Sequence, residues 1–332
     1  MVTVSPVADE AEEELSLDVY NAVWRHDPIT LDESRSFRAG SLEHVDLLAR
    51  ADGEAAGSAV AAIQPQRREL VYVLSTVVPE HRRRGIGTKL YERVSEWAHE
   101  RGLDRIEAPV LDNDPESLAY AQKRGFREER REKGVVLDLA TIEPPRVVPP
   151  EGIEIVTWAE RPELAHGIYD VACEAYIDIP GLESDEMERF EDWLAHDMLG
   201  AGDRPEATFV AVAGDEVVGY AKLILAGATP TKAHHDLTGV KRAWRGRGIA
   251  RALKARQIAW AKANGYEELH TRNDERNVPI LRLNARFGYR PGIGRIYLQG
   301  PLADASRTTS HWPCSHSPTW PGTNACSSEG QG

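Results

Sequence analysis

Two segments of the sequence share a pattern of arginine, glycine and small apolar residues: Arg82-Arg83-Arg84-Gly85-Ile86-Gly87 and Arg245-Gly246-Arg247-Gly248-Ile249-Ala250. Each segment follows a run of strand-forming residues and opens a long stretch with helical periodicity. Glycine lets a backbone approach a ligand closely, and the free N–H groups and dipole of a helix start attract anions. The pattern therefore predicts two phosphate-binding loops, although a tight, solvated turn would explain one such segment alone.

The two segments belong to a longer internal repeat with a constant offset of 163 residues. Because tryptophan is rare and glycine is structurally demanding, chance explains the matches poorly. The halves are therefore expected to share one fold, and the duplication favours the phosphate-binding interpretation. The matched positions are Arg82 and Arg245, Gly85 and Gly248, Trp97 and Trp260, Gly102 and Gly265, and Gly125 and Gly288.

Each half has the same predicted order of elements: a helical stretch, a hairpin, a strand, the Arg/Gly loop, a helix, a strand, a helix and a final strand. Gly102 and Gly265 stand where glycine caps would end the helices that begin at the loops. The final strands are expected at residues 134–139 and 294–298. We therefore predict an α/β fold with two tandem domains, each a mixed, twisted sheet flanked by helices.

A proline-rich segment, Glu-Pro-Pro-Arg-Val-Val-Pro-Pro at residues 143–150, separates the two halves. Prolines restrict φ and remove hydrogen-bond donors, so the segment is expected to be a stiff linker. The predicted domains are residues 1–143 and 152–302, joined by a linker at 144–151. Residues 303–332 are rich in Ser, Thr and Pro without periodicity and are predicted to be a disordered tail.

The composition is that of a globular protein, with 41% apolar and 28% charged residues among 332. A net charge of −13 argues against general nucleic-acid binding, which needs a positive surface. No apolar run is long enough for a bilayer span and the start is acidic, so we expect a cytoplasmic protein without a membrane partner. Cys173, Cys314 and Cys326 are scattered without metal-ligand spacing, and neither a disulfide framework nor a metal site is expected.

Two other phosphate-binding motifs do not fit the loops. A P-loop requires Gly-x-x-x-x-Gly-Lys-Ser/Thr, which neither segment contains. A Rossmann fingerprint requires a third glycine, which is missing after both Gly85-Ile86-Gly87 and Gly246-Arg247-Gly248. The loops instead resemble the hallmark of the GNAT superfamily, Arg/Gln-x-x-Gly-x-Gly/Ala.

The resemblance to GNAT acyltransferases covers residues 10–140 and 152–302 and implies that acetyl-CoA is the acyl donor. In that family the loop amides bind the pyrophosphate and the preceding strand pairs with the pantetheine arm. Carried over by position, the strand edges are Ser75, Thr76 and Val77 in the first half and Thr238, Gly239 and Val240 in the second. Asn277 lies where the family has a cofactor-facing Asn, and the first half has Asn113 followed by Asp114.

The resemblance further implies direct attack of a primary amine on the thioester, helped by a base and by a backbone N–H near a strand bulge. The helix Tyr that commonly protonates the CoA thiolate is replaced by Ala121 and Asn284, and Tyr120 is adjacent to the first of these positions. Asn284 can donate a hydrogen bond to a thiolate. The candidate catalytic residues are Asn284, His235, Asp236 and His270, and they favour the second half as the catalyst.

Several alternatives stay open at this point. One or both halves can be non-catalytic, CoA-binding or structural domains. The tandem arrangement is similar to that of the mycothiol synthases, but Asn284 stands where their second half has the helix Tyr. The acceptor can be a small-molecule or a peptide amine, and the oligomeric state is open. The acidic stretch 178–198 fits a cationic acceptor, and equally a solvated helix face.

Overall fold

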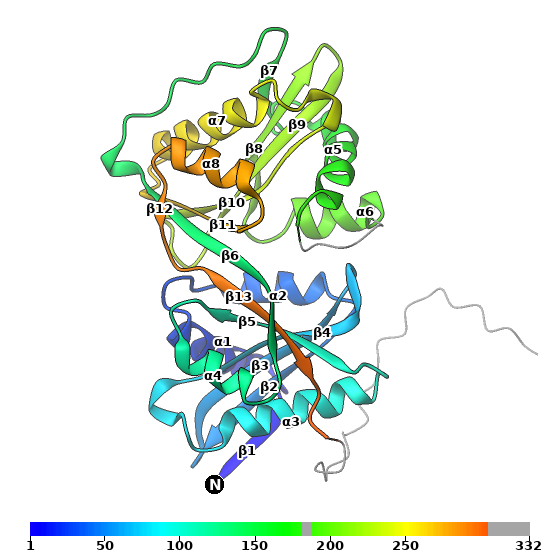
Figure 1. Cartoon of the computed structure of the whole chain (residues 1–332), viewed down its shortest axis with the longest axis vertical. Coiled ribbons are helices and arrows are strands. Elements are labelled where there is room, and N and C mark those ends of the chain that lie inside the picture. The colour runs from blue at the N-terminus through cyan, green and yellow to red at the C-terminus, as the bar shows by residue number, and fades with distance from the viewer. Residues whose placement is uncertain (181–186, 305–332) are drawn as a thin grey trace, which may run out of the picture.

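The two halves of the chain share one continuous sheet in the computed structural model, which describes residues 1–180 and 187–304 (Figure 1). Within these residues the sheet has 13 strands, and helices lie on both of its faces. The predicted α/β fold with two tandem, helix-flanked sheets is confirmed. The strand order is β1-β2-β3-β4-β5-β13-β6-β11-β10-β9-β8-β7, with β12 paired to β6.

The first half contributes the strands β1 (Val2–Pro6), β2 (Glu43–Ala51), β3 (Glu54–Gln64), β4 (Arg67–Val77), β5 (Arg105–Leu111) and β6 (Arg127–Asp138). Its helices are α1 (Glu10–Val23), α2 (Leu31–Ala39), α3 (Ile86–His99) and α4 (Pro115–Gln122). Side chains alternate across a strand, so Val71 and Val73 pack toward α3, whereas Tyr72 contacts Phe37 of α2 on the opposite face. The sheet is therefore sandwiched between two helical layers.

The second half repeats this arrangement. Its strands are β7 (Glu154–Thr157), β8 (Asp203–Ala213), β9 (Glu216–Leu225), β10 (Lys232–Val240), β11 (Glu268–Asp274), β12 (Arg290–Pro291) and β13 (Arg295–Pro301). Its helices are α5 (Ala165–Ile177), α6 (Phe190–Trp193), α7 (Ile249–Ala263) and α8 (Val278–Arg286). The helices α3 and α7, the strands β5 and β11, and the helices α4 and α8 begin 163 residues apart. The offset found in the sequence is thus a structural repeat.

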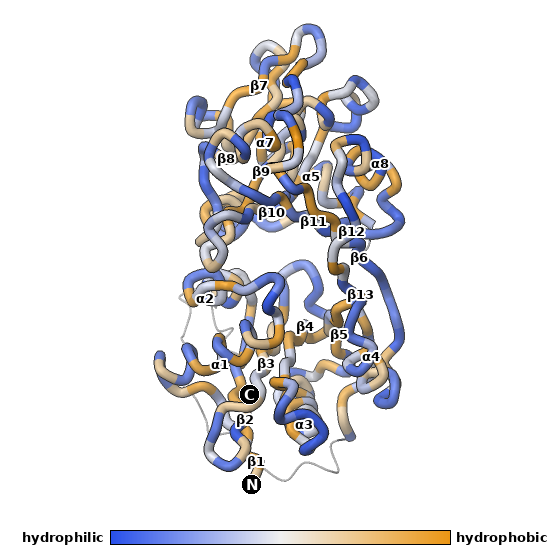
Figure 2. The backbone as a smooth tube through the Cα atoms, turned by 90° about the vertical axis from the view of Figure 1, so that its left-hand side faces the viewer, coloured by the Kyte–Doolittle hydropathy of each residue, from blue (hydrophilic) through white to orange (hydrophobic). Residues whose placement is uncertain are grey.

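The final strands are exchanged between the halves. β13 lies between β5 and β6, pairing along its whole length with β5 from Leu111 to Arg105. β6 pairs with β13 through Arg127–Glu132 and then with β11 through Glu132–Asp138. Figure 2 shows β6 and β13 as the connection between the two halves. The sequence predicted that each half keeps its own last strand, and this prediction is wrong. β6 is long enough to pair with strands of both halves, and β13 covers the edge of β5 that would otherwise be open.

A second connection joins the loop after α1 to the other half. The Asp27 carboxylate accepts hydrogen bonds from Arg272 of β11 at 2.9 Å and from Arg295 of β13 at 3.1 Å. His234 of β10 lies 3.4 Å from the same carboxylate. Burial raises the pKa of Asp27, but Arg272, His234 and Arg295 together outweigh this effect and lower it to about 2. Asp27 therefore stays ionised at neutral pH and holds the halves together.

Some sequence predictions fall on parts of the chain that are not described. The predicted disordered tail from residue 305 onward, with Cys314 and Cys326, lies outside the described residues. So do residues 181–186 of the acidic stretch. In the ranges 1–180 and 187–304, none of the helices is long and apolar enough to cross a bilayer.

The exchange requires very close backbone contact at Gly134 of β6. A Cβ atom at this position would lie 2.0 Å from the carbonyl oxygen of Ile293, just before β13. Gly134→Val should therefore lower the free energy of unfolding by about 2–4 kcal/mol, because the strands must separate to accept it. Both halves should unfold in one transition at lower urea concentration, measured by circular dichroism.

The matched control is Lys133→Val, which changes an exposed position on the same strand. It should leave the transition midpoint nearly unchanged, because its side chain points to solvent. An unchanged midpoint for Gly134→Val, or two separate transitions in the wild-type protein, would contradict the coupling of the halves through β6.

Candidate functional site

The two Arg/Gly loops have the same backbone conformation. Arg83 and its counterpart Gly246 have φ values of 62° and 77°, and Gly85 and Gly248 have φ values of 84° and 88°. Gly85 and Gly248 are the N-caps of α3 and α7, and neither helix start has a side-chain cap. The first N–H groups of both helices are therefore left to a ligand or to solvent, as an anion site requires.

The first arginine of each loop fastens the loop to the strand before it. The Nε atom of Arg82 donates to the Val77 carbonyl oxygen at 3.3 Å, and that of Arg245 donates to Val240 at 2.9 Å. Both guanidinium groups also pair with carboxylates: Arg82 with Asp114 and Glu116, and Arg245 with Asp178. The structure thus gives these arginines a positioning role; phosphate binding by Arg82–Gly87 and Arg245–Ala250 stays a prediction.

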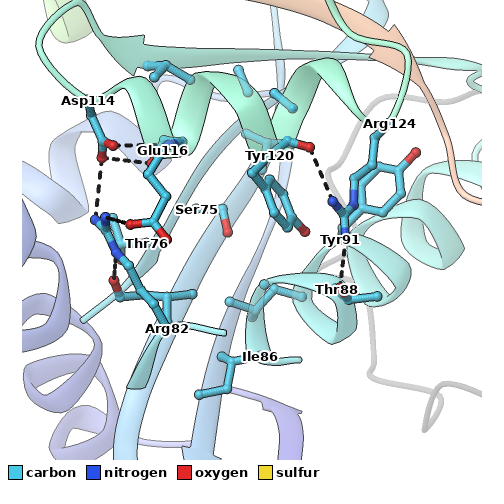
Figure 3. Close-up of a pocket in the computed structure, with 18 of the residues that line it drawn as sticks. Ser75, Thr76, Arg82, Ile86, Thr88, Tyr91, Asp114, Glu116, Tyr120 and Arg124 are labelled. Carbon is cyan, nitrogen blue, oxygen red and sulfur yellow. Dashed lines mark hydrogen bonds and ion pairs between the residues drawn. The ribbon is translucent and has the colours of Figure 1, made fainter. Parts of the chain in front are cut away.

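A cavity of about 490 Å³ lies beneath the first loop (Figure 3). It occupies the space where β4 and β5 diverge, because these parallel strands pair only at Val71–Ile106 and Tyr72–Glu107. The predicted strand edge, Ser75, Thr76 and Val77, lines one side, and α3 and α4 line the other. The lining also includes Val23 and Trp24 at the end of α1, so the cavity passes through the sheet.

The cavity is polar at its outer end and apolar at its inner end. Arg83, Lys123 and Arg124 line it where the loop and α4 meet solvent. The inner walls are buried aliphatic and aromatic side chains, none more than 7% exposed: Leu90, Val94, Ile106 and Phe126. A ligand with an anionic head and a less polar arm matches this gradient.

Tyr120 extends from α4 over the loop end of this cavity. Its hydroxyl oxygen lies 3.3 Å from the place that a Cβ atom on Gly87 would take, so it rests on the first turn of α3. The Arg124 guanidinium stacks 3.6 Å from the Tyr120 ring centroid and donates to the Thr88 hydroxyl at 2.7 Å. Partial burial raises the pKa of Tyr120, although 38% of the residue stays exposed. The sequence left Tyr120 unassigned because one residue along a helix turns a side chain by about 100°; both Tyr120 and Ala121 line the cavity.

The same positions in the second half carry a connected set of polar side chains. The Lys254 Nζ atom donates to Asn284 Oδ1 at 2.6 Å, and Asn284 Nδ2 donates to Asn273 Oδ1 at 2.8 Å. Lys254 and Asn284 are both 1% exposed. We call these residues, with His235, Gln257 and Tyr289, the polar cluster. Five of its members correspond through the 163-residue offset to cavity-lining residues of the first half: Lys254 to Tyr91, Gln257 to Val94, Asn273 to Val110, Asn284 to Ala121 and Tyr289 to Phe126.

The predicted catalytic residues of the second half are engaged with other side chains. His235 is buried between Gln257 Oε1, at 3.0 Å, and the Tyr289 hydroxyl, and burial lowers its pKa well below the ordinary value. Asp236 lies 3.1 Å from the Lys222 Nζ atom, and His270 lies 2.8 Å from a Glu268 carboxylate oxygen. The structure therefore joins His235 and Asn284 to one buried cluster and places Asp236 and His270 elsewhere.

The residues expected to face the cofactor after the fifth strand of each half are helix caps. The Asn277 side chain accepts from the Ile280 N–H at 3.5 Å at the start of α8, and Asp114 accepts from Ser117 at 3.0 Å at the start of α4. Asn113 is exposed. Cofactor binding by Asn113 and Asn277 stays a prediction, and the capping role is one that the sequence left unstated.

One feature of the second half fits catalysis. The pairing of β10 with β9 shifts register between His235 and Thr238, which marks a strand bulge of the kind expected to free a backbone N–H. The corresponding part of β4 pairs with β3 without a shift from Tyr72 to Val77. The bulge and the cavity thus lie in different halves.

The comparisons with known proteins agree with this architecture. The model of the acetyltransferase (GNAT) family matches residues 10–126 and 165–289. The chain belongs to this family. A GCN5-related N-acetyltransferase from Sphaerobacter thermophilus is 23% identical, with a TM-score of 0.72 over 90% of this chain and 95% of that one. A tandem GNAT protein from the clavulanic acid biosynthesis pathway is 19% identical, with a TM-score of 0.74 over 92% of this chain and 100% of that one.

These GNAT structures establish the shared fold and the tandem arrangement, and the predicted resemblance is confirmed. No curated protein matches the chain. Acyl transfer is the general activity of the family to which both matched regions belong.

The polar cluster makes stability depend on pH in a defined way. Burial lowers the pKa of Lys254 to about 7, whereas an unfolded lysine keeps a value of about 10.4. Between these values the unfolded chain binds one more proton than the folded chain, so the wild-type free energy of unfolding rises with pH. Lys254→Met removes this contribution. The variant's stability relative to the wild type should therefore fall by up to about 1.4 kcal/mol per pH unit above pH 7.

Urea unfolding between pH 6 and pH 10 measures this difference. Lys123→Met, which alters an exposed lysine, is the control and should follow the wild-type pH dependence. Parallel curves for Lys254→Met and the wild type would show that Lys254 is not a buried, easily deprotonated amine.

Proposed function

We propose that this chain is an acetyl-CoA-dependent N-acetyltransferase that binds its acyl donor in the cavity of the first half. The observation that carries the proposal is the cavity itself, which begins under the Arg82–Gly87 loop and passes through the sheet between β4 and β5. The preference for the second half rested on Asn277, Asn284 and the histidines. Asn284 and His235 are buried in the polar cluster there, which favours the first half instead.

The donor's position follows from the two ends of the cavity. The N–H groups at the start of α3, behind the left-handed Gly85, supply the pyrophosphate site. Beyond Tyr72, no strand in the described part of the chain pairs with the backbone edge of β4 that faces β5, because β5 pairs there with β13. The pantetheine amides can pair with this edge at Ser75, Thr76 and Val77, which places the thioester at the inner end of the cavity.

The acceptor then approaches from the other face of the sheet, beside Trp24. Its amine nitrogen attacks the thioester carbonyl carbon, the C–N bond forms, and the C–S bond breaks as CoA leaves. The nitrogen gives up its proton to a base or to water, and the thiolate takes up a proton. The Tyr120 hydroxyl rests on the first turn of α3, at the end of the cavity where this proposal puts the pyrophosphate.

The strand bulge of β10 supports a second candidate, in which the second half performs the transfer. In that case the polar cluster must rearrange to admit the donor, because its side chains hold the positions that line the cavity in the first half. A non-catalytic second half that only completes the shared sheet is the other alternative.

A matched pair of glycine substitutions decides which half binds the donor. Gly85→Val and Gly248→Val change the same left-handed N-cap in two loops of equal geometry. We expect Gly85→Val to weaken CoA binding by more than tenfold, because a β-branched residue is strained at this φ and distorts the anion site. Gly248→Val should bind CoA within about twofold of the wild type. Calorimetric titration with CoA gives both values, with circular dichroism to verify folding.

The opposite result, in which only Gly248→Val loses CoA affinity, would place the donor site in the second half. Equal losses in both variants would mean two sites for each chain. Either result would contradict the assignment to the first half.

Transfer itself is tested by thiol release from acetyl-CoA with a panel of primary amines: polyamines, amino sugars, amino acids and peptides with free N-termini. Release of CoA should accompany acetylation of at least one class, shown by mass spectrometry of the acceptor. Gly85→Val should abolish that release. A panel without thiol release in the wild-type protein would count heavily against N-acetyltransfer.

A further inference from the structure

The first-half cavity is lined by a small residue at the position of the usual GNAT helix tyrosine. Ala121 of α4 stands at that tyrosine's position, and Ala108 of β5 lines the cavity as another small residue. The second half has Asn284 in the place of Ala121, and it is hydrogen-bonded to Lys254. The methyl side chains of Ala121 and Ala108 thus leave open a space in the first half. In the second half, the larger, polar side chain of Asn284 stands at the position of Ala121.

The walls around this space are apolar. Among the described lining residues that are buried, none carries a titratable side chain: Trp24, Val73, Thr76, Ile86, Leu90, Val94, Ile106, Pro109 and Phe126. The Thr76 hydroxyl is paired with the Ser58 hydroxyl at 2.9 Å. The charged lining residues are exposed or partly exposed and come from the loop and the two ends of α4: Arg82, Arg83, Asp114, Glu116, Lys123 and Arg124. The inner end is therefore suited to a hydrocarbon group.

The part of the donor that reaches this end is the acyl group. This step rests on the proposed donor site, in which the pyrophosphate lies at the loop and the pantetheine arm follows β4. The thioester then lies between β4 and β5, with Ala108 and Ala121 beyond it. We infer that the cavity accepts acyl groups longer than acetyl, and that butyryl-CoA and hexanoyl-CoA are bound more tightly than acetyl-CoA.

The expected size of the effect follows from burial of methylene groups. Each buried methylene contributes about 0.8 kcal/mol, or about a fourfold change in Kd. Butyryl-CoA, with two more methylenes than acetyl-CoA, should therefore bind about fifteenfold more tightly. CoA without an acyl group measures the affinity that the loop and β4 provide.

Calorimetric titration of the full chain with CoA, acetyl-CoA, butyryl-CoA and hexanoyl-CoA tests the inference. The wild-type Kd should fall with chain length at least as far as butyryl-CoA. Ala121→Leu fills the space from the helix, and Ala108→Leu fills it from the strand. Each variant should abolish the decrease in Kd with acyl chain length, while its Kd for CoA stays within about threefold of the wild-type value. Gln122→Leu adds the same bulk at an exposed position on α4 and should keep the wild-type series.

The failures of the two proposals are distinguishable. If CoA and acetyl-CoA bind but the longer acyl groups bind no more tightly, the inference is overturned and the proposed acetyl transfer is untouched. If CoA does not bind, the donor site of the first half is wrong and the inference falls with it. A chain-length effect that survives both alanine substitutions would overturn the assignment of the acyl group to this end of the cavity.

Discussion

The pairing of β6 with β13 at one end and with β11 at the other is the constraint on which the rest of the molecule depends. Because β13 covers β5, and β6 covers β11, neither half leaves these strands as open edges. The divergence of β4 and β5 lies next to this junction: β5 is held from its far side by β13 and is free to separate from β4. The strand β5, which lines the cavity in the first half, is therefore held in place by a strand of the second half.

The two loops have the same backbone conformation, but this conformation alone does not determine whether a cavity lies beside the loop. Their φ angles agree to within a few degrees at Gly85 and Gly248, and both precede helices without side-chain caps. The two halves differ in the side chains of the helices that follow the loops. Tyr91 and Ala121 belong to an open cavity, whereas Lys254 and Asn284, at the same positions of the repeat, are hydrogen-bonded to each other in the interior. Side-chain identity on α3, α4 and their counterparts distinguishes a site from a packed core.

Much of the fold could be predicted because its signals are local. Glycine caps, turn residues and helical periodicity predicted the element order, and the offset of 163 residues predicted the tandem repeat. The exchange of β13 could not be predicted in this way, because a strand has the same alternation whichever neighbour it pairs with. Gly134 is a sequence feature that reflects the exchange, because the Ile293 backbone passes too close to this position for any side chain.

The site was predictable in part. Ser75, Thr76 and Val77 were placed by the loop that follows them, and they do line the cavity. Asn284 was predicted to be catalytic because it takes the place of the family's helix Tyr, and His235 because it enters the fourth strand. Their burial and their hydrogen bonds within the polar cluster depend on contacts that sequence spacing does not reveal. Comparing the two halves position by position, with Ala121 against Asn284 and Val94 against Gln257, would have indicated the difference.

The exchanged strands also have a consequence for how the molecule is assembled. Two identical protomers that trade their last strands form a domain-swapped dimer, whose existence depends on protein concentration. Here the residues 144–151 place both partners in one chain, so the trade is intramolecular and persists at any dilution. Covalent linkage also frees the partners from sequence identity. One copy can therefore keep an open interior while the other fills its interior with polar side chains and still supplies the strand that its partner needs.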